Sequence, residues 1–239
     1  MTLLDIHRIR AALPARSIDY YSTIDSTMTA AAACPPGAVV LAEEQTAGQG
    51  RHGHSWLSAA GSGIYCSIVL EPRPLLTLAL GLAAADAIAA TTGLACDLRW
   101  PNDLMLAEKK VGGILVQLVD GRAIAGIGIN VNRTSFPAGL STEATSLRLH
   151  AAHSIDATAI VIALLQAVDT FVAEPPESIL RLFAHASSYA AGRRVTVHQP
   201  DGIIEGTTAG LDSSGFLIVR QDDGTDTLVL AGGVRAART

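Results

Sequence analysis

The sequence has little charge of either sign and few aromatic residues. Of its 239 residues, 16% are charged and 4% are aromatic, and the net charge is −5. A small acidic net charge gives no overall attraction to nucleic acid. The hydrophobic fraction of 49% excludes a disordered chain and is enough for one large domain, or one domain with a small companion.

Cysteine is also scarce, and long membrane-like runs are lacking. The three cysteines form no Cys-x-x-Cys pair, which predicts reduced thiols rather than disulfides or a metal centre. The N-terminus carries charges where a secretory signal needs an apolar segment. The apolar stretch 75–95 contains Asp86 and several glycines and threonines, which favours a buried helix over a membrane span. We therefore expect a cytoplasmic protein.

The most informative stretch is the loop at residues 42–56, which follows an apolar run typical of a buried strand. Three glycines interrupt it; Arg51 and one histidine stand between them, and a second histidine follows directly. Open backbone N–H groups beside a guanidinium suit an anionic ligand such as a phosphate or a carboxylate. Taken alone, the composition fits a mobile surface loop equally well.

Two later motifs decide between these interpretations: Arg99-Trp100-Pro101-Asn102-Asp103 and Lys109-Lys110-Val111-Gly112-Gly113. Together with Gly48-Gln49-Gly50-Arg51-His52-Gly53-His54-Ser55-Trp56, they resemble the signature motifs of biotin protein ligases in order and spacing. The resemblance runs from about Ser26 to the C-terminus. It implies an α+β fold, with a class II aminoacyl-tRNA-synthetase-like mixed sheet and helices over residues 1–189 and a small SH3-like β-barrel over 190–239.

The pattern of the chain agrees with two such parts. Apolar periodicity and capping signals predict helices over 3–13, 75–92, 157–173 and 175–187. Strands are expected over 18–21, 63–70, 97–100, 111–119 and 122–132, the last two joined by a tight turn at Asp120-Gly121. Residues 133–150 are expected to form a polar loop. From Arg193 onward, short β-runs alternate with turns, which is typical of a small all-β domain.

The resemblance also implies a set of site residues. Arg51, Lys110 and Asp103 are expected to act in catalysis, with Asp103 helping the incoming amine or the metal. The residues implied to bind biotin are Ser26, Thr27, Gln45, Gly48, Gln49, Gly50, Arg51, Lys110, Gly113 and Gly126. Those implied to bind ATP and the adenylate are Arg51, His54, Trp56, Trp100, Asn102, Asp103, Lys110 and Asn130.

Several of these residues have simpler local explanations. Ser26 and Thr27 precede an alanine run and can act only as a helix cap. Asn102-Asp103 is a common turn sequence. A lysine such as Lys110 is usually solvated, although the two glycines after it allow a ligand to approach the backbone.

The implied reaction has two steps: biotin and ATP form biotinyl-5′-AMP, and a lysine of a biotin carboxyl carrier domain, as in acetyl-CoA carboxylase, then takes the biotin. Mg²⁺ is expected with ATP, and no metal site made by the protein alone. Only about 25 residues precede Ser26, so a DNA-binding repressor module is not expected. Nucleic-acid and membrane partners are likewise not expected, and the chain is expected to be a monomer or a homodimer.

Three positions depart from the family pattern. Gln49 and His54 stand where arginine is common, and Arg99 stands where lysine is frequent. Fewer cations in the loop predict faster release of the adenylate. The alternatives to a biotin ligase are a lipoate or octanoate ligase on the same type of fold and a biotin-binding protein without catalytic activity.

Overall fold

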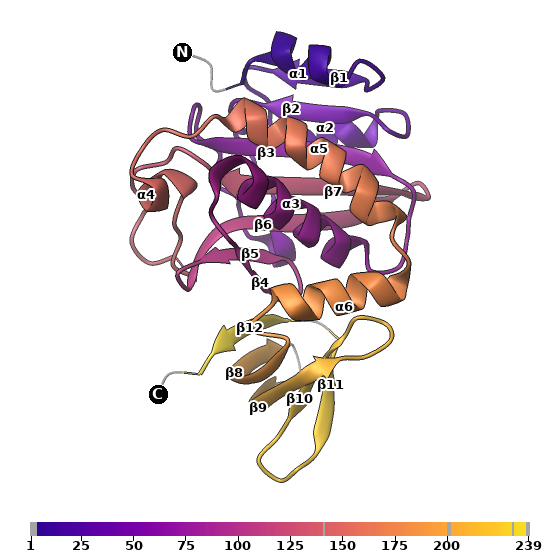
Figure 1. Cartoon of the computed structure of the whole chain (residues 1–239), viewed down its shortest axis with the longest axis vertical. Coiled ribbons are helices and arrows are strands. Elements are labelled where there is room, and N and C mark those ends of the chain that lie inside the picture. The colour runs from indigo at the N-terminus through magenta and orange to yellow at the C-terminus, as the bar shows by residue number, and fades with distance from the viewer. Residues whose placement is uncertain (1–3, 141, 200–201, 231, 238–239) are drawn as a thin grey trace.

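The chain forms two β-sheets, one large and mixed and one small and antiparallel (Figure 1). The computed structural model describes residues 4–140, 142–199, 202–230 and 232–237. In the large sheet the strand order is β1-β2-β3-β7-β6-β5-β4, and in the small sheet it is β11-β10-β9-β8-β12.

The large sheet is antiparallel except at one edge, where β1 and β2 run parallel. Its strands are β1 (Ile18–Tyr21), β2 (Val39–Ala42), β3 (Gly63–Leu70), β4 (Asp97–Arg99), β5 (Asp103–Leu106), β6 (Lys109–Val119) and β7 (Arg122–Asn130). The strands expected at 18–21 and 63–70 have the expected bounds. The sequence did not predict β5.

The two faces of the large sheet have different roles. On one face, Ile64, Cys66 and Ile68 of β3 enter the main core, which α3 (Leu76–Thr92) and α5 (Ala157–Ala173) cover (Figure 1). On the other face, Val69 packs with α2 (Thr27–Ala32) in a smaller apolar cluster. This alternation is what a strand requires, because successive side chains point to opposite faces. The second face is therefore only partly covered, which leaves room for a site.

The remaining helices are α1 (Ile6–Ala12), α4 (Leu147–Ala151) and α6 (Pro176–Ala186). α4 interrupts the region that we expected to be only loop. Asp156 caps α5 by accepting a hydrogen bond from the Ala159 N–H, as the sequence predicted. Among the helices of the described residues, none has the length and apolar character that crossing a membrane requires.

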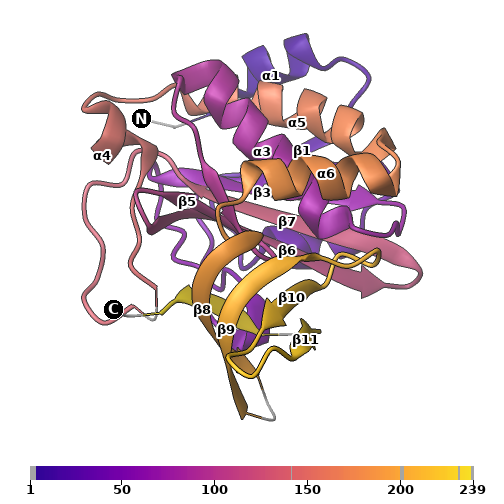
Figure 2. The ribbon, with the colours of Figure 1, turned by 60° about the horizontal axis from the view of Figure 1, so that its bottom comes forward.

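The small sheet follows α6 and curls back toward the large one (Figure 2). It consists of β8 (Ala191–Gln199), β9 (Gly202–Leu211), β10 (Leu217–Arg220), β11 (Asp226–Val229) and β12 (Gly233–Ala236). Its contacts with the large sheet include the indole Nε1 of Trp100, which donates to the Gly215 carbonyl at 2.9 Å. The domain boundary at 189/190 stays a prediction, two residues before β8 begins.

Candidate functional site

A cavity of about 760 Å³ lies on the partly covered face of the large sheet. Its floor comes from β3, β6 and β7, and its walls come from the start of α2, the glycine-rich loop and the stretches 136–140 and 142–144. Gly232, Val234 and Arg235 of the small domain close one side. Every site residue named from the sequence lines this cavity except Gly48. The cavity therefore brings together segments that are far apart in the chain.

The glycine-rich loop is a small hairpin that forms one wall. The Trp56 N–H donates to the Gly48 carbonyl at 2.8 Å, and the Gly50 N–H donates to the His54 carbonyl at 2.7 Å. A Cβ at Gly48 would lie 2.6 Å from the Trp56 carbonyl oxygen, so only glycine lets the hairpin close there. Gly48 thus does not line the cavity, but it allows the hairpin that forms the cavity wall to close. Arg51 stands in the 3-10 turn at the tip of the hairpin.

The Trp56 indole rests on the cavity floor. A Cβ at Gly128 of β7 would lie 2.5 Å from Trp56 Cε2, so the missing side chain makes the seat for this ring. The indole Nε1 is buried and has no hydrogen-bond partner among the described residues. A buried N–H without a partner costs free energy unless a ligand accepts from it. Trp56 therefore lies with its ring against β7, and its indole N–H is buried and unpaired within the part of the chain that the structure describes.

A chain of hydrogen bonds organises the end of the cavity next to α2. The Ser67 hydroxyl donates to Thr27 Oγ1 at 2.8 Å, and Thr27 donates to Gln45 Oε1 from both its N–H and its hydroxyl, at 2.9 and 3.0 Å. The Gln45 amide Nε2 in turn donates to the Ser58 hydroxyl at 2.8 Å. This network holds Thr27 and Gln45 in fixed orientations. Ser58 and Ser67 were not predicted, because an isolated serine carries no pattern in the sequence.

Ser26 stands at the cap position of α2, but its side chain does not cap the helix. The residue is 1% exposed, and its hydroxyl has no partner among the described residues. The helix-cap explanation for this hydroxyl is therefore wrong. A buried hydroxyl at a cavity wall can bond with a polar group of a bound ligand, which removes the penalty of leaving it unpaired.

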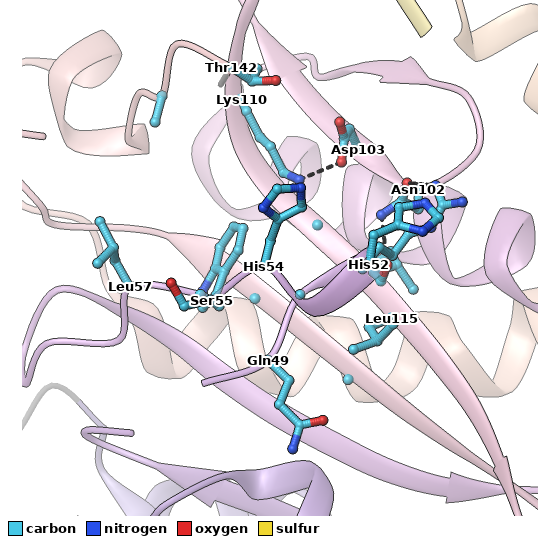
Figure 3. A pocket seen from close by; sticks show the side chains of 18 of the residues that line it. Gln49, His52, His54, Ser55, Leu57, Asn102, Asp103, Lys110, Leu115 and Thr142 are labelled. Atoms are coloured by element: carbon cyan, nitrogen blue, oxygen red, sulfur yellow. Dashed lines mark hydrogen bonds and ion pairs between the residues drawn. The ribbon is translucent and has the colours of Figure 1, made fainter. Parts of the chain in front are cut away.

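The opposite end of the cavity is cationic. Lys110 Nζ lies 2.5 Å from Asp103 Oδ1 (Figure 3). Arg99 Nη2 lies 2.5 Å from Asp103 Oδ2. Arg51 Nη1 donates to Asn102 Oδ1 at 2.8 Å, and Asn102 is held by its own bond to the Ile114 carbonyl at 2.9 Å. Figure 3 shows Gln49 directed away from the Lys110–Asp103 pair.

A β-bulge brings Lys110 to this face. Gly112 pairs with Leu104, whereas Lys110 pairs with Met105, so Val111 is the extra residue in β6. In a regular strand, residues three positions apart such as Lys110 and Gly113 point to opposite faces, and the extra residue of the bulge removes this alternation. With the bulge, a Cβ at Gly113 would lie 3.1 Å from Lys110 Cε, so the two positions share the cavity side.

The charges of this end are set by burial and by their neighbours. Burial alone would raise the pKa of Asp103, but Lys110 and Arg99 outweigh it and hold the pKa below its ordinary value. Burial lowers the pKa of Arg51, although Asp103 opposes the shift. One carboxylate faces three cations, so the cluster has positive charge left over for an anionic ligand.

The comparisons with known proteins agree with this arrangement. Residues 17–133 match the biotin/lipoate A/B protein ligase family, and residues 191–233 match the biotin protein ligase C-terminal domain. The chain is 31% identical to the biotin–[acetyl-CoA-carboxylase] ligase of Paracoccus denitrificans over 234 residues, 87% of this chain and 95% of the relative. The chain belongs to the biotin protein ligase family.

Two further relatives show how the chain compares in length and in fold. The bifunctional ligase/repressor of Bacillus spizizenii is 32% identical over 206 residues, and this chain spans 63% of its length. The biotin protein ligase from Aquifex aeolicus in complex with biotin and ATP superposes with a TM-score of 0.84 at 28% identity, covering 93% of this chain and 99% of that one. The predicted α+β fold with a C-terminal β domain is confirmed.

Three residues predicted to bind the nucleotide have contacts or exposure that the motifs did not indicate. The Trp100 indole is buried and its Nε1 donates to the Gly215 carbonyl of the small domain, so this residue lines the cavity and also contacts the small domain. Asn130 is buried, and its Nδ2 donates to the Thr145 carbonyl at 3.1 Å. His54 is exposed at the cavity rim.

The small domain contributes to the cavity as well. Arg51 Nη1 also donates to the Gly232 carbonyl, at 3.4 Å, so one contact of the cationic end comes from outside the large sheet. No motif in the sequence indicated this contribution.

Proposed function

We propose that this chain activates biotin with ATP and transfers it to a lysine of a biotin carboxyl carrier domain of a biotin-dependent carboxylase. The main support is that one cavity joins two unlike ends. One end carries the Ser26 hydroxyl, which has no partner in the described part of the chain, beside an ordered polar network, and the other carries Arg51 and Lys110. A ligand with a polar uncharged head and a carboxylate tail fits such a cavity, because each end meets matching chemistry.

The first step needs charge neutralisation. A biotin carboxylate oxygen attacks the α-phosphorus of ATP, the bond from that phosphorus to the bridging oxygen breaks, and pyrophosphate leaves. Arg51 and Lys110 offset the repulsion between the two anions and stabilise the charge that develops on the phosphate oxygens. Asn102 holds the Arg51 guanidinium in place for this task.

In the second step, the neutral amine of the acceptor lysine attacks the carbonyl carbon of the mixed anhydride, the bond from that carbon to the phosphate oxygen breaks, AMP leaves, and the amine loses one proton to solvent. We assign Asp103 a positioning role rather than that of a base. Both its oxygens are engaged by cations, and its lowered pKa makes it a weak proton acceptor. Asp103 thus fixes the Lys110 ammonium over the reacting groups.

Mg²⁺ is proposed to arrive with the nucleotide, where it would neutralise phosphate charge. Within the described ranges, no group of three or more His, Cys, Asp or Glu side chains is arranged for a metal ion. The donor chemistry therefore favours an ion held mainly by ATP oxygens. Acetyl-CoA carboxylase as the acceptor and a cytoplasmic location are proposals as well.

A lipoate or octanoate ligase is the nearest alternative, since one family model covers both ligase types. The match of residues 191–233 to the biotin protein ligase C-terminal domain favours biotin. The test is incubation with ATP, Mg²⁺ and labelled biotin, with a biotin carrier domain and a lipoyl domain offered separately. Label is expected on the carrier lysine only. Transfer of lipoate without biotin binding would overturn the proposal.

Two variants connect the activity to the cavity. Arg51→Ala and Lys110→Ala are each expected to abolish biotin-dependent exchange of pyrophosphate into ATP. If the unmodified chain binds biotin but forms no adenylate, it is a binding protein without ligase activity.

A further inference from the structure

Two hairpins in the large sheet have turns of the same type but different sequences. Leu106 pairs with Lys109 across Ala107-Glu108, and Val119 pairs with Arg122 across Asp120-Gly121. All four turn residues have positive φ, at 46° and 63° in the first turn and 49° and 76° in the second. Two-residue turns of this kind match the twist of the flanking strands.

Only the second turn has residues that favour this backbone. Asp-Gly is among the preferred pairs because aspartate tolerates a positive φ and glycine meets no steric penalty there. Alanine and glutamate are both strained at these angles. The Ala107-Glu108 turn therefore needs stabilisation from outside the hairpin.

Contacts from the junction of the two domains, Tyr189 before it and Arg193 after it, supply this stabilisation. The Tyr189 hydroxyl donates to Glu108 Oε2 at 2.9 Å, and the Arg193 guanidinium pairs with the same carboxylate oxygen. The Arg193 guanidinium also lies 4.0 Å from the centre of the Tyr189 ring. A lone exposed ion pair stabilises little, but this one belongs to a network anchored on a buried tyrosine.

The anchor extends to the edge of the large sheet. Arg193 Nη1 donates to the Ser188 hydroxyl at 2.9 Å, and Ser188 donates to Asp97 of β4 through its hydroxyl at 2.5 Å and its N–H at 2.8 Å. The residues that hold Glu108 are thus themselves held in place. Glu108 is two residues from Lys110 and lies on the hairpin whose other strand begins with Asp103.

We propose that Glu108, Tyr189 and Arg193 form an interdomain latch that holds the strained Ala107-Glu108 turn and thereby positions Lys110 and Asp103. The inference rests on the proposed function for its catalytic consequence, because the latch residues touch no substrate. The small domain then acts on adenylate formation through the shape of the β5–β6 hairpin. Glu108, Tyr189 and Arg193 are positioning residues.

The decisive comparison uses two variants that both lose the Glu108 carboxylate. Glu108→Ala keeps the backbone strain and removes the latch. Ala107→Asn with Glu108→Gly removes the latch but gives the turn a favoured Asn-Gly pair. Hydrogen exchange at the amides of 103–113 reports on the hairpin without any assumption about the reaction. Biotin-dependent pyrophosphate exchange gives kcat/KM for ATP, and calorimetry gives the biotin Kd.

We expect faster amide exchange in Glu108→Ala and about fivefold lower kcat/KM for ATP, with an unchanged biotin Kd. The Asn-Gly double variant is expected to restore both quantities. The latch would be overturned if Glu108→Ala had the same amide exchange as the unmodified chain. It would also be overturned if the double variant were as impaired in amide exchange and in kcat/KM as Glu108→Ala. If the unmodified chain forms no adenylate, the proposed function fails, and amide exchange still tests the latch.

The β6–β7 turn provides a matched control. Asp120→Ala with Gly121→Glu places the same unfavourable pair at the other end of β6 from Lys110. This variant should have a lower Tm with unchanged kcat/KM for ATP. A drop in kcat/KM as large as that of Glu108→Ala would mean that general destabilisation explains the effect, which refutes the latch.

Discussion

The seat of Trp56 on β7 gives a prediction that the structure makes quantitative. In Gly128→Ala, the new Cβ would lie 2.5 Å from Trp56 Cε2 and 2.6 Å from Nε1, below the 3.0 Å that Cβ atoms essentially never cross. The indole is rigid, and the Trp56 N–H is bound to the Gly48 carbonyl at 2.8 Å. The ring must therefore move by about 1 Å to regain ordinary contact distances.

Forcing an extra methyl group into a packed site costs about 1–3 kcal/mol. If that penalty falls on the bound state, the biotin Kd rises by about fivefold to a hundredfold. If it falls on the hairpin instead, the free energy of unfolding decreases by the same amount. Calorimetric titration with biotin and urea unfolding measure the two parts separately.

Gly126→Ala is the matched variant two residues earlier on the same strand. Its Cβ would lie 2.7 Å from Met28 Sδ, and an unbranched methionine side chain can rotate away at low cost. The expected loss is below about 1.5 kcal/mol. Gly128→Ala that binds biotin and unfolds like the unmodified chain, or a Gly126→Ala that is equally damaged, would refute the reasoning.

Three further predictions concern the cations of the site. Asp103→Asn leaves Lys110 and Arg99 without their shared carboxylate. The free energy of unfolding measured in urea should therefore fall by about 3 kcal/mol, and adenylate formation should also fall. An unchanged free energy of unfolding would contradict this. Because the pKa of Asp103 is lowered, its contribution is fully present above about pH 4 and is lost as pH falls through the lower folded value. The stability difference between the unmodified chain and Asp103→Asn should thus be equal at pH 7 and pH 5 and shrink at pH 3. Gln49→Arg with His54→Arg adds loop cations and should slow adenylate dissociation, measured by filter binding; an unchanged off-rate would remove the charge argument.

Much of the fold was accessible from the sequence where local signals and tertiary structure agree. The strand at 63–70 and the hairpin at Asp120-Gly121 have strong local preferences, and both form as expected. β5 was missed because it is four residues long and its turn, Ala107-Glu108, contains no turn-forming residue. Contacts distant in sequence stabilise that turn, so no local pattern indicates it.

The site shows the same division. Motifs placed Arg51, Asn102 and Lys110 in one cavity, because charged and polar residues in fixed order carry a recognisable pattern. The Val111 bulge that turns Lys110 toward the cavity depends on pairing with β5 and is not visible in the chain. The Ser26 hydroxyl was expected as a ligand contact or a helix cap; the structure excludes the cap, and the ligand contact stays a prediction.

The chain has only two tryptophans, and they stand in different surroundings. Trp56 lines the cavity and its indole N–H has no partner among the described residues, whereas the Trp100 indole is bonded to Gly215 of the small domain. Their fluorescence can therefore distinguish two events in one molecule: ligand entry changes the emission of Trp56, and separation of the domains changes that of Trp100. Replacing each in turn by phenylalanine gives a pair of single-reporter proteins that need no external dye.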